Sequence, residues 1–144
     1  MFMGEYQHTL DEKGRVAIPA RLRDSLGERF VITRGLDQCL FVYPLEEWAK
    51  IEAKLKALPF TKSDARAFTR MFFSGAIVVE LDKQGRVLVP QHLRDYARVE
   101  KEVRIIGVSN RVEVWSEAVW IEYIRKAGLA YEQVAETLVD DFNL

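Results

Sequence analysis

Residues 10–24 read Leu10-Asp11-Glu12-Lys13-Gly14-Arg15-Val16-Ala17-Ile18-Pro19-Ala20-Arg21-Leu22-Arg23-Asp24, and residues 81–95 read Leu81-Asp82-Lys83-Gln84-Gly85-Arg86-Val87-Leu88-Val89-Pro90-Gln91-His92-Leu93-Arg94-Asp95. The second stretch repeats the first after a shift of 71 positions, from Asp11 to Asp82. The match continues beyond the motif with one extra residue in the second copy, so that Trp48 corresponds to Trp120. The chain is therefore internally duplicated.

Each half of the 144-residue chain is shorter than a unit that usually builds a self-sufficient core. Only two copies are present, and their period exceeds that of common solenoid repeats, which argues against a stacked array. The duplication instead predicts a pseudo-two-fold globule in which the two halves bury each other's apolar faces.

Each copy is predicted to open with a β-hairpin. Strands at residues 5–10 and 75–81 lead into Asp-x-x-Gly turns, where Gly14 and Gly85 supply a positive φ. The returning strands, residues 15–18 and 86–89, stop at prolines, which cannot donate in a β-ladder but can open a helical turn.

The remaining elements follow from apolar spacing, turn glycines and helix caps. We expect short helices at residues 20–26 and 91–97, strand pairs at 30–34 with 40–43 and at 103–106 with 112–115, and amphipathic helices at 44–58, 63–73, 116–124 and 131–139. Trp48 and Trp120 are expected in the core. The resulting division is a first repeat at residues 5–47, a helical connector at 48–75, a second repeat at 76–119 and C-terminal helices at 120–144.

Composition places the chain among globular proteins, with 49% apolar residues, 30% charged residues and a net charge of -1. Its apolar runs are strand-sized, and no signal segment precedes them, so we expect a cytoplasmic protein without membrane contact. Cys39 is the only cysteine, which excludes an intrachain disulfide and favours a packed strand cysteine.

Charge is unevenly distributed along the chain. Cations outnumber acids between Lys13 and Arg34, and acids outnumber cations after Glu113. In the connector, Arg66 and Arg70 can join subunits, bind phosphate or lie on a salt-bridged helix face. The apolar residues of the last helix suit docking on the chain's own β-structure or on a neighbouring copy.

Two sets of residues together resemble a known family. These are the paired Asp-x-x-x-Arg motifs (Asp11 with Arg15, Asp82 with Arg86) inside Leu-Asp-x-x-Gly-Arg-Val, and the connector sequence from Arg66 to Ala76, Arg-Ala-Phe-Thr-Arg-Met-Phe-Phe-Ser-Gly-Ala. Over nearly the whole chain they are similar to the MraZ family, within the wider AbrB-like group.

The resemblance implies a β-rich fold with helices, an internally duplicated, pseudo-two-fold AbrB-like swapped-hairpin β-barrel flanked by amphipathic helices. It also implies a nucleoid-associated bacterial transcriptional regulator that represses its own operon, the division and cell-wall gene cluster. The expected partners are double-stranded DNA with direct repeats in a promoter, and further copies of the chain in a closed ring.

Residue chemistry points to the hairpins as the DNA-binding surface, because a two-stranded ribbon can enter the major groove. Arg15 and Arg86 are the leading candidates for base contacts, and Lys13 and Lys83 for phosphate. Lys13 and Lys83 occupy different positions in the repeat, so the halves can read DNA unequally. The weaker candidates are Arg21 and Arg23.

The alternative for the motif is purely structural. Asp11 and Asp82 can accept hydrogen bonds from turn amides, and each arginine can pair with its aspartate or with the other half. Both roles are compatible, because a carboxylate can orient a guanidinium that faces DNA.

Catalytic and metal-binding patterns are absent from the sequence. His8 and His92 occupy unrelated repeat positions, and no ligand spacing for zinc or phosphate-binding glycine loop is present. We therefore expect no enzyme activity, metal, cofactor or small-molecule substrate. The rival interpretation is an antitoxin-type protein-interaction module in which DNA binding is secondary.

Overall fold

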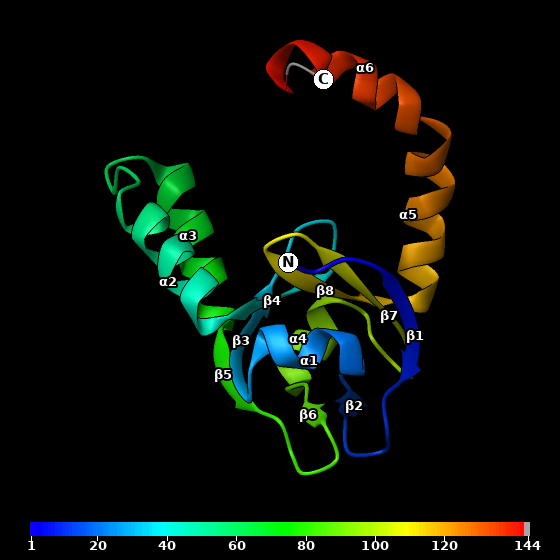
Figure 1. Cartoon of the computed structure of the whole chain (residues 1–144). Helices are drawn as coiled ribbons and strands as arrows, with labels where there is room; N and C mark the ends of the chain where they lie inside the picture. The colour runs from blue at the N-terminus through cyan, green and yellow to red at the C-terminus, as the bar shows by residue number, and fades with distance from the viewer. Residues whose placement is uncertain (143–144) are drawn as a thin grey trace.

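The computed structural model describes the backbone of residues 1–142 and the side chains up to Val139. Residues 143–144 of the expected C-terminal segment lie outside the described residues. The fold is mixed α/β with a large antiparallel sheet (Figure 1).

The first half contains β1 (Glu5–Thr9), β2 (Arg15–Ala17), α1 (Ala20–Leu26), β3 (Arg29–Arg34) and β4 (Leu40–Pro44), followed by helices α2 (Leu45–Lys56) and α3 (Ser63–Gly75). The second half repeats this order with β5 (Ile77–Glu80), β6 (Arg86–Leu88), α4 (Gln91–Tyr96), β7 (Glu102–Val108), β8 (Arg111–Ser116), α5 (Glu117–Leu129) and α6 (Tyr131–Phe142). Every predicted strand and helix is confirmed, with boundaries shifted by a few residues. The larger differences are in the two C-terminal helices, because α5 continues to Leu129, past the last residue of its predicted apolar side at position 124, and α6 continues past residue 139.

Six strands form one antiparallel sheet in the order β1-β7-β8-β4-β3-β5, and β2 pairs with β6 in a separate ribbon. The opening strand of each half pairs with a strand of the other half. Strand β1 of the first half pairs with β7 of the second, and β5 of the second half pairs with β3 of the first. The two halves also meet in the middle of the six-stranded sheet, where Leu40 of β4 lies opposite Val114 of β8.

The expectation of a closed barrel is wrong. Strands β1 and β5 are the two edges of the six-stranded sheet, and they do not pair with each other among the described residues. The ribbon does not close this gap, because β2 and β6 have three residues each and their ladder bonds join them to one another.

Alternating strand residues build a separate core on each face of the sheet. On one face, Phe30, Ile32 and Leu40 pack with the ribbon and with α1 and α4. On the other, Phe41, Tyr43 and Trp115 pack with α2, α3 and α5.

The aromatic face explains the two tryptophans. Trp48 stacks on Phe72 of α3 at 5.5 Å between ring centroids, and Trp120 packs edge-on against Trp115 at 5.1 Å. Trp120 is therefore buried, as predicted, whereas Trp48 is half-buried and packs against the edge of the same aromatic cluster. Cys39 is buried just before β4, where burial raises the pKa of its thiol.

Candidate functional site

One carboxylate organises the turn between β1 and β2. Asp11 Oδ1 accepts hydrogen bonds from the backbone amides of Lys13 and Arg15, each at 2.9 Å, and Asp11 Oδ2 accepts one from Arg15 Nε at 2.7 Å. The Gly14 amide donates to the Asp11 carbonyl at 3.0 Å. The hydrogen bond that the backbone amide of Arg15 donates is the main cause that lowers the pKa of the Asp11 carboxyl.

The turn between β5 and β6 has the same design. Asp82 Oδ1 accepts from the amides of Gln84 and Arg86 at 2.9 Å, and Asp82 Oδ2 accepts from Arg86 Nε at 2.9 Å. The hydrogen bond that the backbone amide of Arg86 donates is again the main cause that lowers the pKa of the Asp82 carboxyl. Both expected structural aspartates thus aim an arginine by its Nε, leaving its terminal nitrogens for other partners.

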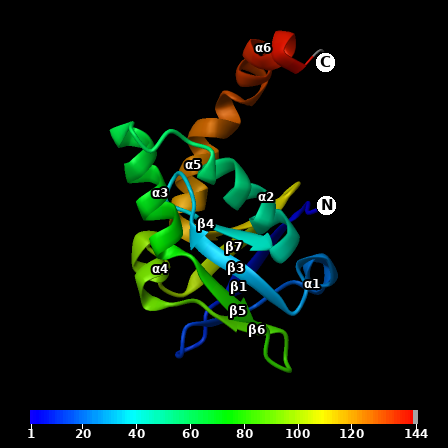
Figure 2. The same ribbon diagram turned by 90° about the vertical axis from the view of Figure 1, so that its left-hand side faces the viewer.

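The two turns lie side by side at one end of the molecule. Figures 1 and 2 show both loops projecting from the end of the sheet opposite to α5 and α6. Arg86 Nη1 is 3.8 Å from Asp11 Oδ2, so the carboxylate of one turn reaches the guanidinium of the other. The Ile18 amide donates to the Gly85 carbonyl, and the Val89 amide to the Gly14 carbonyl, each at 2.9 Å.

Strand alternation turns both arginines outward from the ribbon. Val16 and Val87 are buried in the core, so their neighbours in the ribbon point to the opposite side. The side chains of Arg15 and Arg86 are 30% and 31% exposed. They are held by their aspartates and still accessible to a ligand.

Gly14 and Gly85 adopt φ values of 84° and 74°, as predicted. These glycines also have a packing role. A Cβ on Gly14 would lie 2.8 Å from Arg94 Cζ, and a Cβ on Gly85 would collide with the guanidinium of Arg23. Each half thus supplies an arginine that covers the turn glycine of the other half.

Arg23 lies on the short helix α1, as expected, and its side chain is engaged within the protein. Its Nε donates to the Ile18 carbonyl at 2.7 Å and its guanidinium covers Gly85, so it is a half-buried brace between turns. Sequence reasoning missed its partner Arg94, whose Nε donates to the Val89 carbonyl at 2.9 Å. The signal was present, because the 71-residue shift places Arg94 opposite Arg23.

The other candidate cations are exposed. Lys13 and Lys83 lie in the two turns, and Arg21 lies on the outer side of α1. Lys13 follows the exposed Glu12, whereas Lys83 is followed by Gln84, so the two tips differ in charge pattern as expected.

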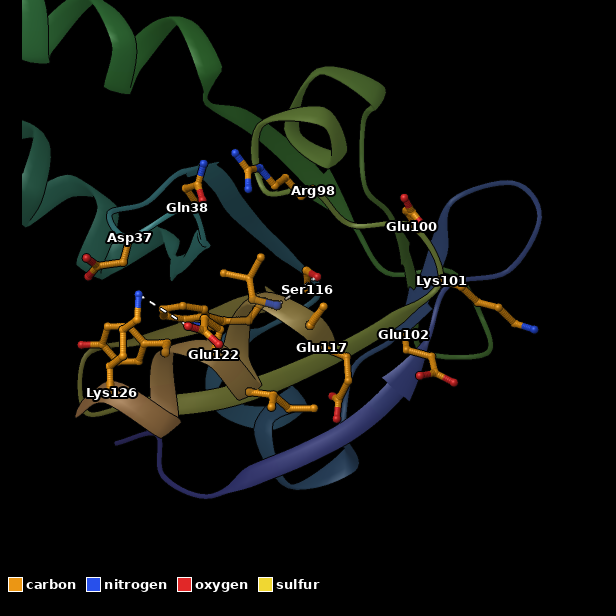
Figure 3. Close-up of a pocket in the computed structure, with 15 residues that line it drawn as sticks. Asp37, Gln38, Arg98, Glu100, Lys101, Glu102, Ser116, Glu117, Glu122 and Lys126 are labelled. Atoms are coloured by element: carbon orange, nitrogen blue, oxygen red, sulfur yellow. Dashed lines mark hydrogen bonds and ion pairs between the residues drawn. The ribbon is translucent and has the colours of Figure 1, made fainter. Parts of the chain in front are cut away.

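A cavity of about 860 Å³ lies away from these turns, beside α5 (Figure 3). Acidic side chains of Glu100, Glu102, Glu117 and Glu122 line it, together with cations such as Lys126. The Lys126 ammonium lies 3.5 Å from the Glu122 carboxylate. This mixed lining is a poor receptor for a phosphate backbone, which favours the turns as the nucleic-acid surface.

The histidines lie in unrelated elements. His8 is in β1, where burial lowers its pKa, and His92 Nε2 is 3.1 Å from the Gly75 carbonyl oxygen. Among the described residues, no group of three or more His, Cys, Asp or Glu side chains is placed to hold a metal ion. No helix in the described part of the chain is long and apolar enough to span a bilayer.

Comparison with known sequences gives a consistent family. A sequence model of the family described as "MraZ protein, putative antitoxin-like" matches residues 1–71 and again residues 72–142. The chain is 65% identical over 140 residues to a "Transcriptional regulator MraZ" of Heliobacterium modesticaldum, covering 97% of this chain and 98% of the relative. Proteins of the same name from Carboxydothermus hydrogenoformans and Caldanaerobacter subterraneus are 62% identical over 140 residues (97% and 98% covered) and 60% identical over 144 residues (100% of both).

Proposed function

The chain belongs to the MraZ family, and from this premise we propose that it is a DNA-binding transcriptional regulator that reads DNA with its paired turns. One observation carries the proposal: two Asp-x-x-x-Arg turns lie side by side at one end, with Arg86 Nη1 3.8 Å from Asp11 Oδ2. Arg15 and Arg86 are preoriented by these carboxylates, which reduces the entropy that an arginine loses when it binds.

Chemical roles within this surface follow from side-chain geometry. Arg15 and Arg86 can contact guanine edges bidentately, worth about 1–3 kcal/mol in discrimination for each good pair. Lys13, Lys83 and Arg21 neutralise phosphates and position the ribbon on the duplex. Arg23 braces the turns, as Arg94 does.

The proposal extends to the architecture of the two halves. Strand pairing of β1 with β7, β2 with β6 and β5 with β3 supports an AbrB-like swapped-hairpin arrangement. We assign the repeats to residues 5–47 and 76–119, joined by the connector at 48–75 and followed by the helices at 120–144. The two family matches, at residues 1–71 and 72–142, support the duplication on which this division is based.

In the cell, the proposed regulator is cytoplasmic and associates with the nucleoid. Several copies in a closed ring contact successive direct repeats and repress the protein's own division and cell-wall operon. A single module with net charge -1 binds one short box weakly, and linked modules raise the effective concentration.

A second candidate function is an antitoxin-type interaction module. The description of the matching family as antitoxin-like and the exposed apolar residues of α6 favour it. Such a module would bind a partner polypeptide in the absence of DNA, and its affinity for that partner would not depend on Arg15 and Arg86.

Fluorescence anisotropy with DNA from the protein's own promoter tests the DNA-binding surface. We expect Arg15→Ala with Arg86→Ala to weaken binding by about 1–3 kcal/mol for each lost base contact. The matched control is Lys50→Ala with Arg98→Ala, which removes two exposed cations away from the turns. Unchanged affinity and salt dependence in the double turn variant would show that the turns do not bind DNA.

A further inference from the structure

The tips of the two turns differ at one equivalent position. The backbone amides of Lys13 and Gln84 each donate to Oδ1 of the aspartate two residues earlier, at 2.9 Å in both turns. The residue that follows each of them is a glycine with a positive φ. Lys13 and Gln84 therefore start from the same backbone geometry, and only their side chains differ.

Both side chains extend from a fixed backbone. Gly14 and Gly85, which follow them, are buried, and the carbonyl of each glycine accepts an amide of the other half at 2.9 Å. Lys13 and Gln84 themselves are exposed, on loops that project from the end of the molecule (Figures 1 and 2). Among the described residues, neither side chain has a hydrogen-bond or ion-pair partner. Both are therefore free to contact a ligand.

The chemistry at this position differs between the turns. A lysine ammonium is a point charge with donors only, which suits phosphate and carries no sequence information. The glutamine amide places one donor beside one acceptor, and this pair matches N7 and the N6 amino group of adenine in the major groove. Charge on the second turn comes from Lys83 and Arg86, so its attraction to phosphate does not depend on Gln84.

The arginines beside these residues are also unequal. Arg86 Nη1 lies 3.8 Å from Asp11 Oδ2, across the two turns, in addition to the bond of its Nε with Asp82. Among the described residues, no salt bridge joins Arg15 to Asp82. From its aspartate to its arginine, the first turn contains two acids and two cations, whereas the second contains one acid and two cations. The second turn is thus the more attractive to a duplex.

We propose that Gln84 is a specificity-determining residue that reads an adenine from the major groove in one half of each DNA box, while Lys13 binds phosphate in the other half. The two halves of one module then select different bases, and the box that the module prefers has no two-fold symmetry. The inference rests on the proposed DNA-binding role of the turns, for which it names one base and the residue that selects it.

A base scan of one promoter box tests this assignment. Each base pair of the box is replaced in turn by the other three, and anisotropy at fixed salt gives the affinity for each duplex. For the wild-type chain, the adenine read by Gln84 should be preferred by about 5- to 150-fold, the range of one good bidentate contact. Gln84→Ala should abolish this preference and keep those at the other base pairs. Its salt dependence should stay unchanged, because glutamine is neutral.

Two further variants complete the test. Lys83→Ala is the matched control, because it removes an exposed side chain from the neighbouring position of the same turn. It should weaken binding to all boxes alike and reduce the salt slope by about 1. Lys13→Gln gives both turns a glutamine and should create a second adenine preference in the other half of the box. This gain also shows that the substituted turn keeps its fold.

Two results for Gln84→Ala would overturn the reading role. One is a chain that keeps every base preference, and the other is a chain that binds all boxes more weakly by the same factor, which would make Gln84 a phosphate contact. A Lys13→Gln chain without a new preference would also contradict the role.

The double variant Arg15→Ala with Arg86→Ala separates this inference from the proposed function. If it loses promoter binding while Gln84→Ala keeps every base preference, the turns bind DNA and only the reading role fails. If both variant chains bind promoter DNA as the wild type does, both proposals fail.

Discussion

Within each turn, one aspartate carries out both tasks of the structural interpretation of the motif. Asp11 accepts turn amides through Oδ1 and holds the Arg15 guanidinium through Oδ2. The structural interpretation of the Asp-x-x-x-Arg motif is therefore confirmed in both halves. It is also the physical basis for the proposed DNA contact, because an arginine fixed at Nε presents its terminal nitrogens in a defined direction.

Acid should weaken both turns. The pKa values of Asp11 and Asp82 lie below their usual value of 3.8, so these carboxylates stabilise the fold above that pH and lose the contribution as pH falls through their folded pKa values. The variant Asp11→Asn with Asp82→Asn should show a flatter dependence of the free energy of unfolding on pH below about 4. Urea denaturation at a series of pH values measures this dependence. A slope as steep as that of the wild-type chain would contradict the role of these two carboxylates.

Among strands and helices, the repeat predicted the element order because the same turn and stop residues occur twice. Gly14 and Pro19 mark the first hairpin, and Gly85 and Pro90 mark the second. What sequence could not supply was the partner of each strand. Pairing of β2 with β6 in a separate ribbon depends on contacts between residues 69 to 73 positions apart, and the barrel expectation failed at this point.

The bracing role of Arg23 was hidden for the same reason. Its position on a short helix next to Arg21 is typical of a solvated cation, and only the fold brings Gly85 beneath its guanidinium. The divergence of α6 from α3 was similarly invisible to apolar spacing, which is helical in both segments.

Helix α4 anchors the ribbon to the core through Leu93, which is fully buried. Leu93→Ala should lower the free energy of unfolding by about 2–5 kcal/mol, since it removes buried methyl groups and leaves a cavity. Leu88→Ala is a matched control on the exposed side of β6, where the leucine is 52% exposed, and should change stability by about 0.5 kcal/mol or less. Urea denaturation midpoints compare the two. Equal losses would mean that α4 does not secure the ribbon.

Across the protein as a whole, the paired turns and the exposed apolar residues of α6 are separated in space. The turns lie at one end of the sheet, and α5 with α6 extend at the opposite end (Figures 1 and 2). A duplex bound at the turns therefore leaves α5 and α6 uncovered, and in the proposed ring each copy adds one pair of turns to a common surface.

Avidity makes the spacing between DNA boxes part of the recognition. Inserting about half a helical turn, roughly 5 base pairs, between two promoter repeats should rotate the second box away from the next copy's turns and reduce affinity toward that of a single box. Inserting about 10 base pairs, one full helical turn, is the control, because it returns the second box to the same face of the duplex as the first. Anisotropy titrations at fixed salt compare these duplexes, and equal affinities for all of them would contradict simultaneous binding of adjacent boxes.

Cleavage of promoter DNA from an iron chelate tethered to a turn would locate the DNA on the protein. Because Cys39 is fully buried, the reagent can be attached at Lys13→Cys or Lys83→Cys, with Lys50→Cys on α2 as the comparison site and the unchanged chain as background. Both turn positions should cut the duplex within the promoter boxes, and position 50 should not. Cleavage from position 50 with none from either turn would place the DNA on the helices and contradict the assignment of the paired turns as the DNA-reading surface.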